Sequence, residues 1–576
     1  MSKIVLVCLR APTPPQVEAT RQSLGRFLET LRPDNLPDVP TAIADDGRGL
    51  FLGIFNPVAG TLRECSAYAG WLADSRAQWW QPRSEVPDGS FVLFRSDAER
   101  VEVLADFVAS RTIWIAKTDD IFVASTSQRA IPWFLGSFKP NRRAILWMLS
   151  SGSLGPGHSW DERAHPLGPA GQALLDRRRW NLRVEEPPIS LHVDPVEDEV
   201  HRGRLRAAMD DTCAGLDLDR SMWALPLSGG RDCRAILLRM QHRGAGLRCV
   251  TWGLREALNK PGTDAFVARE VAHYLGLPHE YVETNPSDDP PERILRRFLV
   301  AGEGRIDHVS AYMDGFELWR SLSARGITGI IRGDQAFGQK RASSADEARL
   351  TVGLAFWSDY RNVPALADLS LRHLGEQELP PALKRKPGES PPDWRDRLVH
   401  AFRIPSVYAA LSDLKSPYVE IANPLLVRRI VELARSHPTH LRTEKKILRD
   451  LAAETNIPVN YADARATAAP DNALAHPSVT EFLLDEISSD GTRKILSADL
   501  VSLVAERLAH ASSRRGTSVR RTAVKRALKR LLPTQLSTAV ARKPERRTLL
   551  ARRLALRAYL ITRMAERLNR DARSIQ

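Results

Sequence analysis

Two glycines between an apolar run and an amphipathic segment give the sequence near residue 230 the character of a phosphate-binding turn. Residues 223–227 predict a strand, Ser228-Gly229-Gly230 a tight turn, and residues 233–240 a helix. Glycine lets backbone N–H groups approach an anion closely, and the helix directs its positive end to the same point. Asp232 begins that helix, where its carboxylate would hold Mg²⁺ on bound phosphates. The competing interpretation is an ordinary glycine turn of an α/β protein.

Further residues around this turn are candidates for contact with a nucleotide. The Ser228 hydroxyl can donate a hydrogen bond to a phosphate oxygen, whereas the Cys233 thiol would do so only weakly. Residues 248–252 predict the next strand, so Thr251 and Trp252 at its end are expected to border the adenine ring. Packing of both residues in a sheet core explains them equally well.

A second acidic residue follows another predicted strand. Residues 327–331 form an apolar run, and Asp334 comes three positions later. The carboxyl ends of parallel strands line one crevice, so Asp334 is expected to meet Asp232 across bound ATP. Two carboxylates match what Mg²⁺ on a triphosphate takes from a protein. The alternative is that Asp334 caps a turn.

Two adjacent lysines supply the third candidate. Residues 425–434 and 445–453 predict two helices on either side of a proline-containing turn, and Lys445 and Lys446 open the second helix. Lys445 is expected to reach the crevice and stabilise negative charge on pyrophosphate or on a tetrahedral intermediate. A pair of solvated lysines is the alternative.

In this order, the three elements resemble the synthetase domain of the asparagine synthetase family. The resemblance implies that ATP and Mg²⁺ are cofactors, and that Lys445 stands where the family has its catalytic lysine. Cys233 replaces the last serine of the family's SGGxDS loop. The matching residues are Ser228, Gly229, Gly230 and Asp232 in the loop, Gly333, Asp334, Phe337 and Gly338 in the acidic motif, and Pro417, Tyr418, Val419, Glu420, Ile447, Leu448 and Arg449 late in the chain.

The N-terminal region resembles, more faintly, the glutaminase domain that this family carries. The similar residues are 106–114 and 122–125. That domain uses an N-terminal cysteine as its nucleophile, but residue 2 is Ser2, and Cys8 lies inside a predicted strand. We therefore expect an inactive glutaminase-like domain, and ammonia from glutamine is not the expected nucleophile.

Family members without that cysteine include β-lactam synthetases and lasso peptide cyclases, which join a substrate's own amine to its own carboxylate. β-Lactam synthetases have tyrosine, and asparagine synthetases glutamate, three residues before the second aspartate, where this chain has Ile331. The favoured prediction is an AMP-forming ligase that closes a macrolactam in a ribosomal precursor peptide. One alternative is ammonia-dependent amidation of a small acid. The other is a non-catalytic binding protein, which the departures Cys233 and Gln335 would suit.

The sequence divides into three regions. Residues 1–195 contain runs typical of strands (KIVLVCL, GLFLGIF, SFVLFRS, RVEVLAD, TIWIAK and DIFVAST). The resemblance to the glutaminase domain implies that these strands form an α+β sandwich. Residues 200–500 alternate strands with helices, as in a doubly wound parallel sheet. Prolines and acidic residues between positions 185 and 199 indicate a linker, and residues 501–576 predict a basic helical extension.

Charge is concentrated in that extension. Residues 514–576 contain 19 Lys and Arg against 3 Asp and Glu, so the rest of the chain is close to neutral despite its net charge of +14. Helical patterns over residues 519–532 and 546–568 would bind nucleic acid, an anionic membrane or an acidic partner, or else pack on the body. Aromatic residues for base stacking are nearly absent, which disfavours nucleic acid.

Composition sets the expected location and partners. The five cysteines show no CxxC pair, which suits a reduced cytoplasm. No apolar window reaches about 18 residues, so no transmembrane segment is expected. The N-terminal KIVLVCL is too short for a signal peptide. The expected partners are a precursor peptide or small carboxylate, and a second maturation enzyme.

Overall fold

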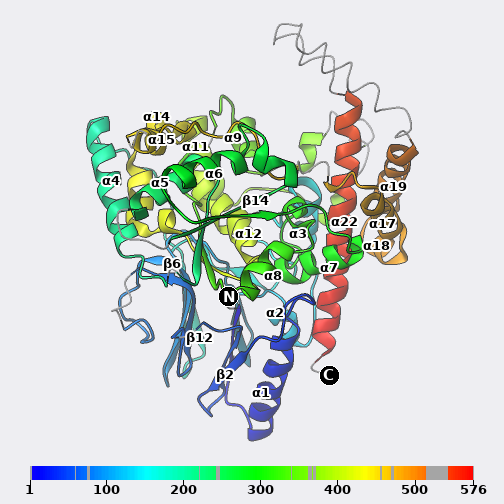
Figure 1. Ribbon diagram of the computed structural model, residues 1–576. Helices are drawn as coiled ribbons and strands as arrows, with labels where there is room; N and C mark the ends of the chain where they lie inside the picture. The colour runs from blue at the N-terminus through cyan, green and yellow to red at the C-terminus, as the bar shows by residue number, and fades with distance from the viewer. Residues whose placement is uncertain are drawn as a thin grey trace.

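The computed structural model describes residues 3–58, 60–73, 78–219, 221–241, 247–338, 340–360, 366, 371–454, 457–468, 473–513 and 543–574. The predictions for Ser2 and for a helix over residues 519–532 lie outside these ranges. Within them, three sheets and their covering helices form a mixed α/β fold (Figure 1). The mixed α/β class, with antiparallel sheets and one parallel sheet, is as predicted.

The N-terminal apolar runs form two six-stranded antiparallel sheets. The first has the order β10 (His165–Pro166), β8 (Trp114–Lys117), β9 (Ile121–Ser125), β1 (Lys3–Leu9), β3 (Leu50–Phe55) and β2 (Thr41–Asp45). The second has the order β12 (Asn181–Glu185), β11 (Gln172–Asp176), β7 (Arg100–Ala105), β6 (Gly89–Ser96), β5 (Ser66–Leu72) and β4 (Leu62–Arg63).

Strand β1 shows why these runs are apolar on both faces. Successive strand residues point to opposite sides of a sheet. Ile4, Leu6 and Cys8 enter the core between the two antiparallel sheets, whereas Val5 and Val7 pack against helices on the other side. A strand covered on both faces has no polar side, so KIVLVCL is almost continuously hydrophobic.

The third sheet is parallel and has the order β15 (His279–Glu283), β14 (Arg248–Gly253), β13 (Trp223–Pro226), β16 (Gly329–Ile331) and β17 (Glu420–Ala422). The chain proceeds from β13 outward to β15 and then returns to β16 on the other side of β13. The strand order therefore reverses between β13 and β16. In open parallel sheets, the crevice at the carboxyl ends of such a pair is the usual ligand site.

Helices cover both faces of this sheet. In β13, Ala224 belongs to one core cluster and Leu225 to another, and β16 divides in the same way between Ile330 and Ile331. The principal helices around it are α4 (Asp198–Ala214), α5 (Arg231–Gln241), α6 (Asp264–Tyr274), α7 (Pro291–Gly302), α8 (Glu317–Ala324), α11 (Pro391–Leu398), α12 (Ala409–Asp413), α13 (Arg428–Ser436) and α15 (Lys446–Ala453).

The segment around β17 is held by the antiparallel sheets. The Asn56 side chain donates to the carbonyl of Pro417 at 3.2 Å, and the Tyr418 hydroxyl donates to Asn35 at 2.6 Å. Arg111 and Glu420 form a buried ion pair. These contacts fix one edge of the parallel sheet against the N-terminal sandwich.

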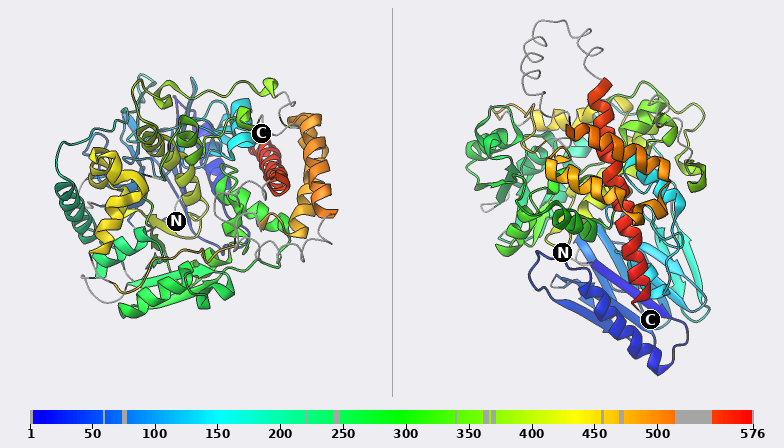
Figure 2. Two further views of the ribbon diagram at one scale, coloured as in Figure 1. Left: turned by 90° about the horizontal axis from the view of Figure 1, so that it is seen from above. Right: turned by 90° about the vertical axis from the view of Figure 1, so that its right-hand side faces the viewer.

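The C-terminal helix α22 (Lys543–Arg573) lies within the body and not beyond it. It runs down the right-hand side of the molecule in Figure 1, beside α17 (Pro477–Ser488), α18 (Asp490–Ile495) and α19 (Ala498–Ser513). It also contacts α2 (Ala130–Leu135) and α3 (Arg142–Ser151), and Figure 2 shows the same placement from two other sides. The boundary expected at residue 500 falls inside α19.

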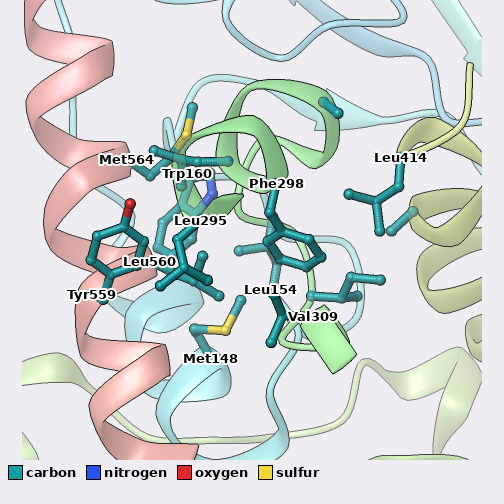
Figure 3. Close-up of a cluster of buried hydrophobic side chains, with 14 of the residues drawn as sticks. Met148, Leu154, Trp160, Leu295, Phe298, Val309, Leu414, Tyr559, Leu560 and Met564 are labelled. Carbon is teal, nitrogen blue, oxygen red and sulfur yellow. The ribbon is translucent and has the colours of Figure 1, made fainter. Parts of the chain in front are cut away.

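Apolar residues of α22 enter the largest core cluster of the molecule. Tyr559, Leu560 and Met564 pack near Phe298 of α7 and Met148 of α3 (Figure 3). The predicted pattern over residues 546–568 is thus helical, and apolar residues such as Leu554, Leu556 and Leu560 are buried. None of the helices in the described ranges is both long and apolar enough to cross a membrane.

Candidate functional site

A cleft opens at the carboxyl edge of the parallel sheet, where the strand order reverses. We call it the sheet-edge cleft. Its cavity volume is about 270 Å³, just below the roughly 300–1,000 Å³ typical of ligand pockets. Seven of the nine predicted site residues line it: Ser228, Gly230, Asp232, Cys233, Thr251, Trp252 and Asp334.

The two glycines of the turn have different surroundings. A Cβ atom at Gly229 would lie 2.4 Å from the Cβ of Ala462 and 2.9 Å from that of Val267, so this position faces protein. A Cβ at Gly230 would meet only the Ser228 Oγ, at 3.2 Å. Gly230 lines the cleft, and its N–H donates to that same hydroxyl. Close packing therefore explains why residue 229 is glycine. Residue 230 is glycine at a position where the backbone is open to the cleft.

Asp232 and Lys445 form an ion pair at the cleft. Asp232 lies in the first turn of α5, whose amino end points to the turn, as anion binding requires. Lys445 precedes α15 and has a left-handed backbone (φ 56°), as does Glu444 before it (φ 55°). Burial raises the pKa of Asp232, and the Lys445 ammonium opposes that rise.

Lys446 lies elsewhere. Its ammonium pairs with Asp450, 2.6 Å away and one turn along α15. Of the two adjacent lysines, only Lys445 is paired with a residue that lines the sheet-edge cleft. Lys445 thus reaches the cleft, whereas Lys446 is a partly exposed lysine paired on its own helix.

Asp334 follows β16 and faces the same cleft. Its carboxylate accepts two hydrogen bonds from the Arg332 guanidinium, at 2.9 and 3.2 Å. Burial alone would raise the pKa of Asp334, but Arg332 holds it below its usual range. A Cβ at Gly333 would lie 3.2 Å from the Cβ of Asp232, so the missing side chain lets the end of β16 approach α5.

These residues fit a magnesium ion that is shared with a nucleotide. The Oδ1 atom of Asp232 is buried without a hydrogen-bond partner in the described structure, although Oδ2 pairs with Lys445. Mg²⁺ commonly takes one or two carboxylates and completes its shell with phosphate oxygens and water. No cluster of three or more His, Cys, Asp or Glu side chains suited to a metal occurs among the described residues. Asp232 and Asp334 therefore supply the one or two carboxylates that Mg²⁺ on a nucleotide takes from a protein.

Thr251 and Trp252 end β14 beside the cleft, but their side chains have structural partners. The Thr251 hydroxyl donates to the Leu227 carbonyl at 2.5 Å and lies 2.9 Å from Nε2 of His279. The Trp252 ring packs edge-on against Trp319, with centroids 5.4 Å apart. At this edge the Thr251 hydroxyl therefore fastens β14 to the turn after β13.

Three further cleft residues gave weak or no sequence signals. Asp264, the first residue of α6, lines the cleft. Burial raises the pKa of its carboxyl, and a hydrogen bond from the N–H of Gly229 opposes that rise. Arg231 and Arg332 also line the cleft. Arg231 directly precedes Asp232, and Arg332 is two positions before Asp334. Both arginines could therefore have been predicted as cleft residues from their place after a predicted strand.

The segment 457–468 closes another side of the cleft and was not predicted. The Arg234 guanidinium donates to the carbonyls of Val459 and Asn460 at 2.8 and 3.1 Å, which holds this segment against α5. Ala466 and Thr467 then line the cleft. The segment carries no helix or strand, so no periodicity marks it in the sequence.

The N-terminal sheets show no thiol suited to nucleophilic attack among the described residues. Cys8 is fully buried in β1, and burial raises the pKa of its thiol to about 11. Cys65 is also buried, and its pKa is raised to about 12. A cysteine nucleophile acts as its thiolate, which these sites disfavour.

Comparison with models of known protein families gave no match to the chain. Comparison with curated protein sequences gave none either.

Proposed function

We propose that the chain is an ATP-dependent, AMP-forming ligase that activates a carboxylate and joins it to an amine. The supporting observation is that a glycine turn, a helix amino end, Asp232, Asp334 and Lys445 meet at one cleft. Lys445 is 213 positions from Asp232, so this combination does not arise from one local turn. Of known families, asparagine synthetases carry similar motifs in the same order.

The first half-reaction places the substrate carboxylate on the α-phosphate of ATP and releases pyrophosphate. Backbone N–H groups of the turn and of α5, with Arg231, would hold the phosphates. Asp232 and Asp334 would hold Mg²⁺, which offsets phosphate charge. The Lys445 ammonium lies beside Asp232. From there it would donate to the departing pyrophosphate as negative charge develops on the pyrophosphate.

In the second half-reaction the amine attacks the acyl carbon and AMP leaves. Ile331 is buried in the sheet core, so its position supplies no acid or base. An α-amino group with a pKa near 7.7–8.0 is partly deprotonated at neutral pH, so it needs no strong base. Holding amine and acyl adenylate together makes the attack effectively unimolecular.

Closure of a macrolactam in a precursor peptide is the favoured form of this reaction. In this form residues 1–195 are an inactive glutaminase-like sandwich, residues 200–500 a synthetase domain, and residues 501–576 a helical C-terminal part. The buried thiols of the sandwich support a substrate that brings its own amine. None of the five cysteines forms a disulfide, which fits a cytoplasmic enzyme.

The test begins with ATP binding and AMP formation by the full chain, beside Asp232→Ala. We expect Mg²⁺-dependent ATP binding that Asp232→Ala weakens, and no AMP with aspartate and ammonium. A precursor peptide should then elicit AMP and pyrophosphate in equal amounts.

Other outcomes separate the alternatives. AMP formed from aspartate and ammonium, and lost in Asp232→Ala, would replace peptide cyclisation by amidation of a small acid. Nucleotide binding without turnover of any amine-bearing substrate would favour a non-catalytic binding protein. Absence of Mg²⁺-dependent ATP binding would contradict both the ligase and the nucleotide site.

A further inference from the structure

A second cavity adjoins the sheet-edge cleft. We call it the apolar cavity; its cavity volume is about 120 Å³, and it lies between the loop after β15, α7 and the start of α17. Thr467 lines both spaces, so the two meet at this residue. Its walls include Ile294, Met313 and Val479, which are buried in the fold.

The apolar cavity continues into a strongly acidic groove. The acidic groove shares Asp289 and Asp314 with the cavity and has a volume of about 520 Å³. Five carboxylates and two guanidinium groups line it: Glu283, Asp288, Asp289, Asp314, Glu317, Arg297 and Arg320. The excess of negative charge is local, because the whole chain has a net charge of +14.

Both arginines are already paired. Arg297 binds Asp34 and Asp289, each at 2.6 Å, and Arg320 pairs with Glu317 within α8. Neither Asp288 nor Asp314 has an ion-pair partner in the described ranges. The groove therefore presents carboxylates that no cation of the described structure neutralises.

Asp314 lies at the junction of the cavity and the groove. Its two oxygens accept the N–H groups of Phe316 and Leu318, each at 3.1 Å, so the side chain is fixed at the start of α8. It is only 8% exposed. Burial raises the pKa of this carboxyl to about 6, which leaves it mostly ionised at neutral pH. A buried anion beside an apolar wall favours a ligand with a positive charge on an apolar body.

We propose that the apolar cavity and acidic groove bind a peptide segment that carries an apolar side chain followed by a positively charged group. The proposal rests on the proposed function, because it makes this segment part of the substrate whose reacting end lies in the sheet-edge cleft. The apolar side chain fills the cavity, and the cationic group lies against Asp314 and the groove.

Binding of two matched dyes tests this without requiring turnover. Monodansylcadaverine has an apolar ring and a primary ammonium, whereas N-pentyl dansylamide has the same ring and no charge. We expect the cationic dye to bind the full chain at least tenfold more tightly at pH 7.5. Acetyl-Phe-Lys-amide should displace it more strongly than acetyl-Phe-norleucine-amide.

Three variants locate the site. Ala311→Trp, at an exposed position lining the cavity, should weaken both dyes at least tenfold, and Ala324→Trp, an exposed alanine at the end of α8, should weaken neither. Asp314→Asn should weaken only the cationic dye. Thermal unfolding measured on the same samples shows whether each variant is folded, and ATP binding is measured separately.

Equal affinity for the two dyes, no binding of the cationic dye, or unchanged binding in Ala311→Trp would overturn the proposal. The reverse order of the two peptides would also overturn it. Loss of the ligase function is a separate result: if ATP does not bind but the dyes behave as expected, the cavity remains a binding site and the proposed reaction fails.

Discussion

Lys445 forms its ion pair with Asp232, 213 positions earlier, whereas Lys446 pairs with Asp450 on its own helix. The backbone explains the difference. Left-handed conformations at Glu444 and Lys445 turn the chain sharply before α15, so two adjacent side chains face different surroundings. Conformations of this kind cost about 1–3 kcal/mol and persist where neighbouring structure enforces them.

Replacing each lysine separately therefore tests the catalytic assignment. Lys445→Ala should lower the rate of pyrophosphate release about 10²–10³-fold, since it removes a charge placed to stabilise the transition state. Lys446→Ala should stay within about twofold, because surface ion pairs contribute little. Pyrophosphate release and thermal unfolding are measured on both. Equal losses in the two variants would contradict the role of Lys445.

Buried histidines make the stability of the chain depend on pH. His437 lies beside His201, with their Nδ1 atoms 3.1 Å apart, and burial lowers the pKa of His437 to about 3. Burial likewise lowers the pKa of His400 well below its usual value. The unfolded chain binds these protons near pH 6.5, and the folded chain binds them only at much lower pH. Stability is therefore lost as the pH falls below about 6.5.

The expected slope is at most about 1.4 kcal/mol per pH unit for each histidine that stays neutral. Urea unfolding of the wild type between pH 7 and pH 4.5 should show the decline. In His437→Asn, whose amide can replace the Nδ1 contact, the slope should be smaller by up to one proton's contribution. Parallel pH profiles in the two proteins would show that His437 titrates normally in the folded state.

At the scale of elements, the two glycines of the turn have different roles: Gly229 packs against protein, whereas Gly230 lines the cleft. Gly229→Ala would place a Cβ within 2.4 Å of Ala462, so we expect a loss of about 1–3 kcal/mol in the free energy of unfolding. Gly230→Ala should cost less stability but weaken ATP binding, because its Cβ enters the cleft. Urea unfolding and ATP titration of both variants check this. If Gly229→Ala weakened ATP binding and Gly230→Ala lowered stability more, the roles assigned to the two glycines would be wrong.

The elements with strong local patterns were predictable from sequence. The strands β13, β14 and β16, the turn at Ser228 and the helices α5 and α6 all carry apolar runs or helical periodicity. Several strands of the antiparallel sheets were not predicted. β12 (Asn181–Glu185), for example, is largely exposed at the edge of its sheet, so its sequence shows little hydrophobic pattern.

Contacts between distant segments could not be predicted in the same way. The ion pair of Asp232 with Lys445 required the relative placement of α5 and α15, which only the folded chain supplies. The segment 457–468 contributes Thr467 to two cavities without any periodic signal. Gly229 was assigned to anion binding because its packing partners, Val267 and Ala462, are remote in sequence.

At the scale of the whole molecule, α22 joins parts that lie far apart in the sequence. Arg557 of this helix pairs with Asp307 at 2.7 Å and donates to the carbonyls of Leu149 and Ser150. Asp571 pairs with Arg129, 2.8 Å away beside α2. Deleting residues 514–576 would expose this core, so loss of function after such a deletion would not demonstrate a partner-binding tail.

Substitutions in α22 test whether this helix is part of the core or serves only to recruit a partner. Leu560 is fully buried in the cluster of Figure 3, so Leu560→Ala should lower the free energy of unfolding by about 2–5 kcal/mol. Asn569→Ala, at an exposed position of the same helix, should change it by less than about 0.5 kcal/mol. Urea unfolding followed by tryptophan fluorescence reports on both. A helix that only recruits a partner would unfold without affecting the rest, and Leu560→Ala would then leave the main transition unchanged.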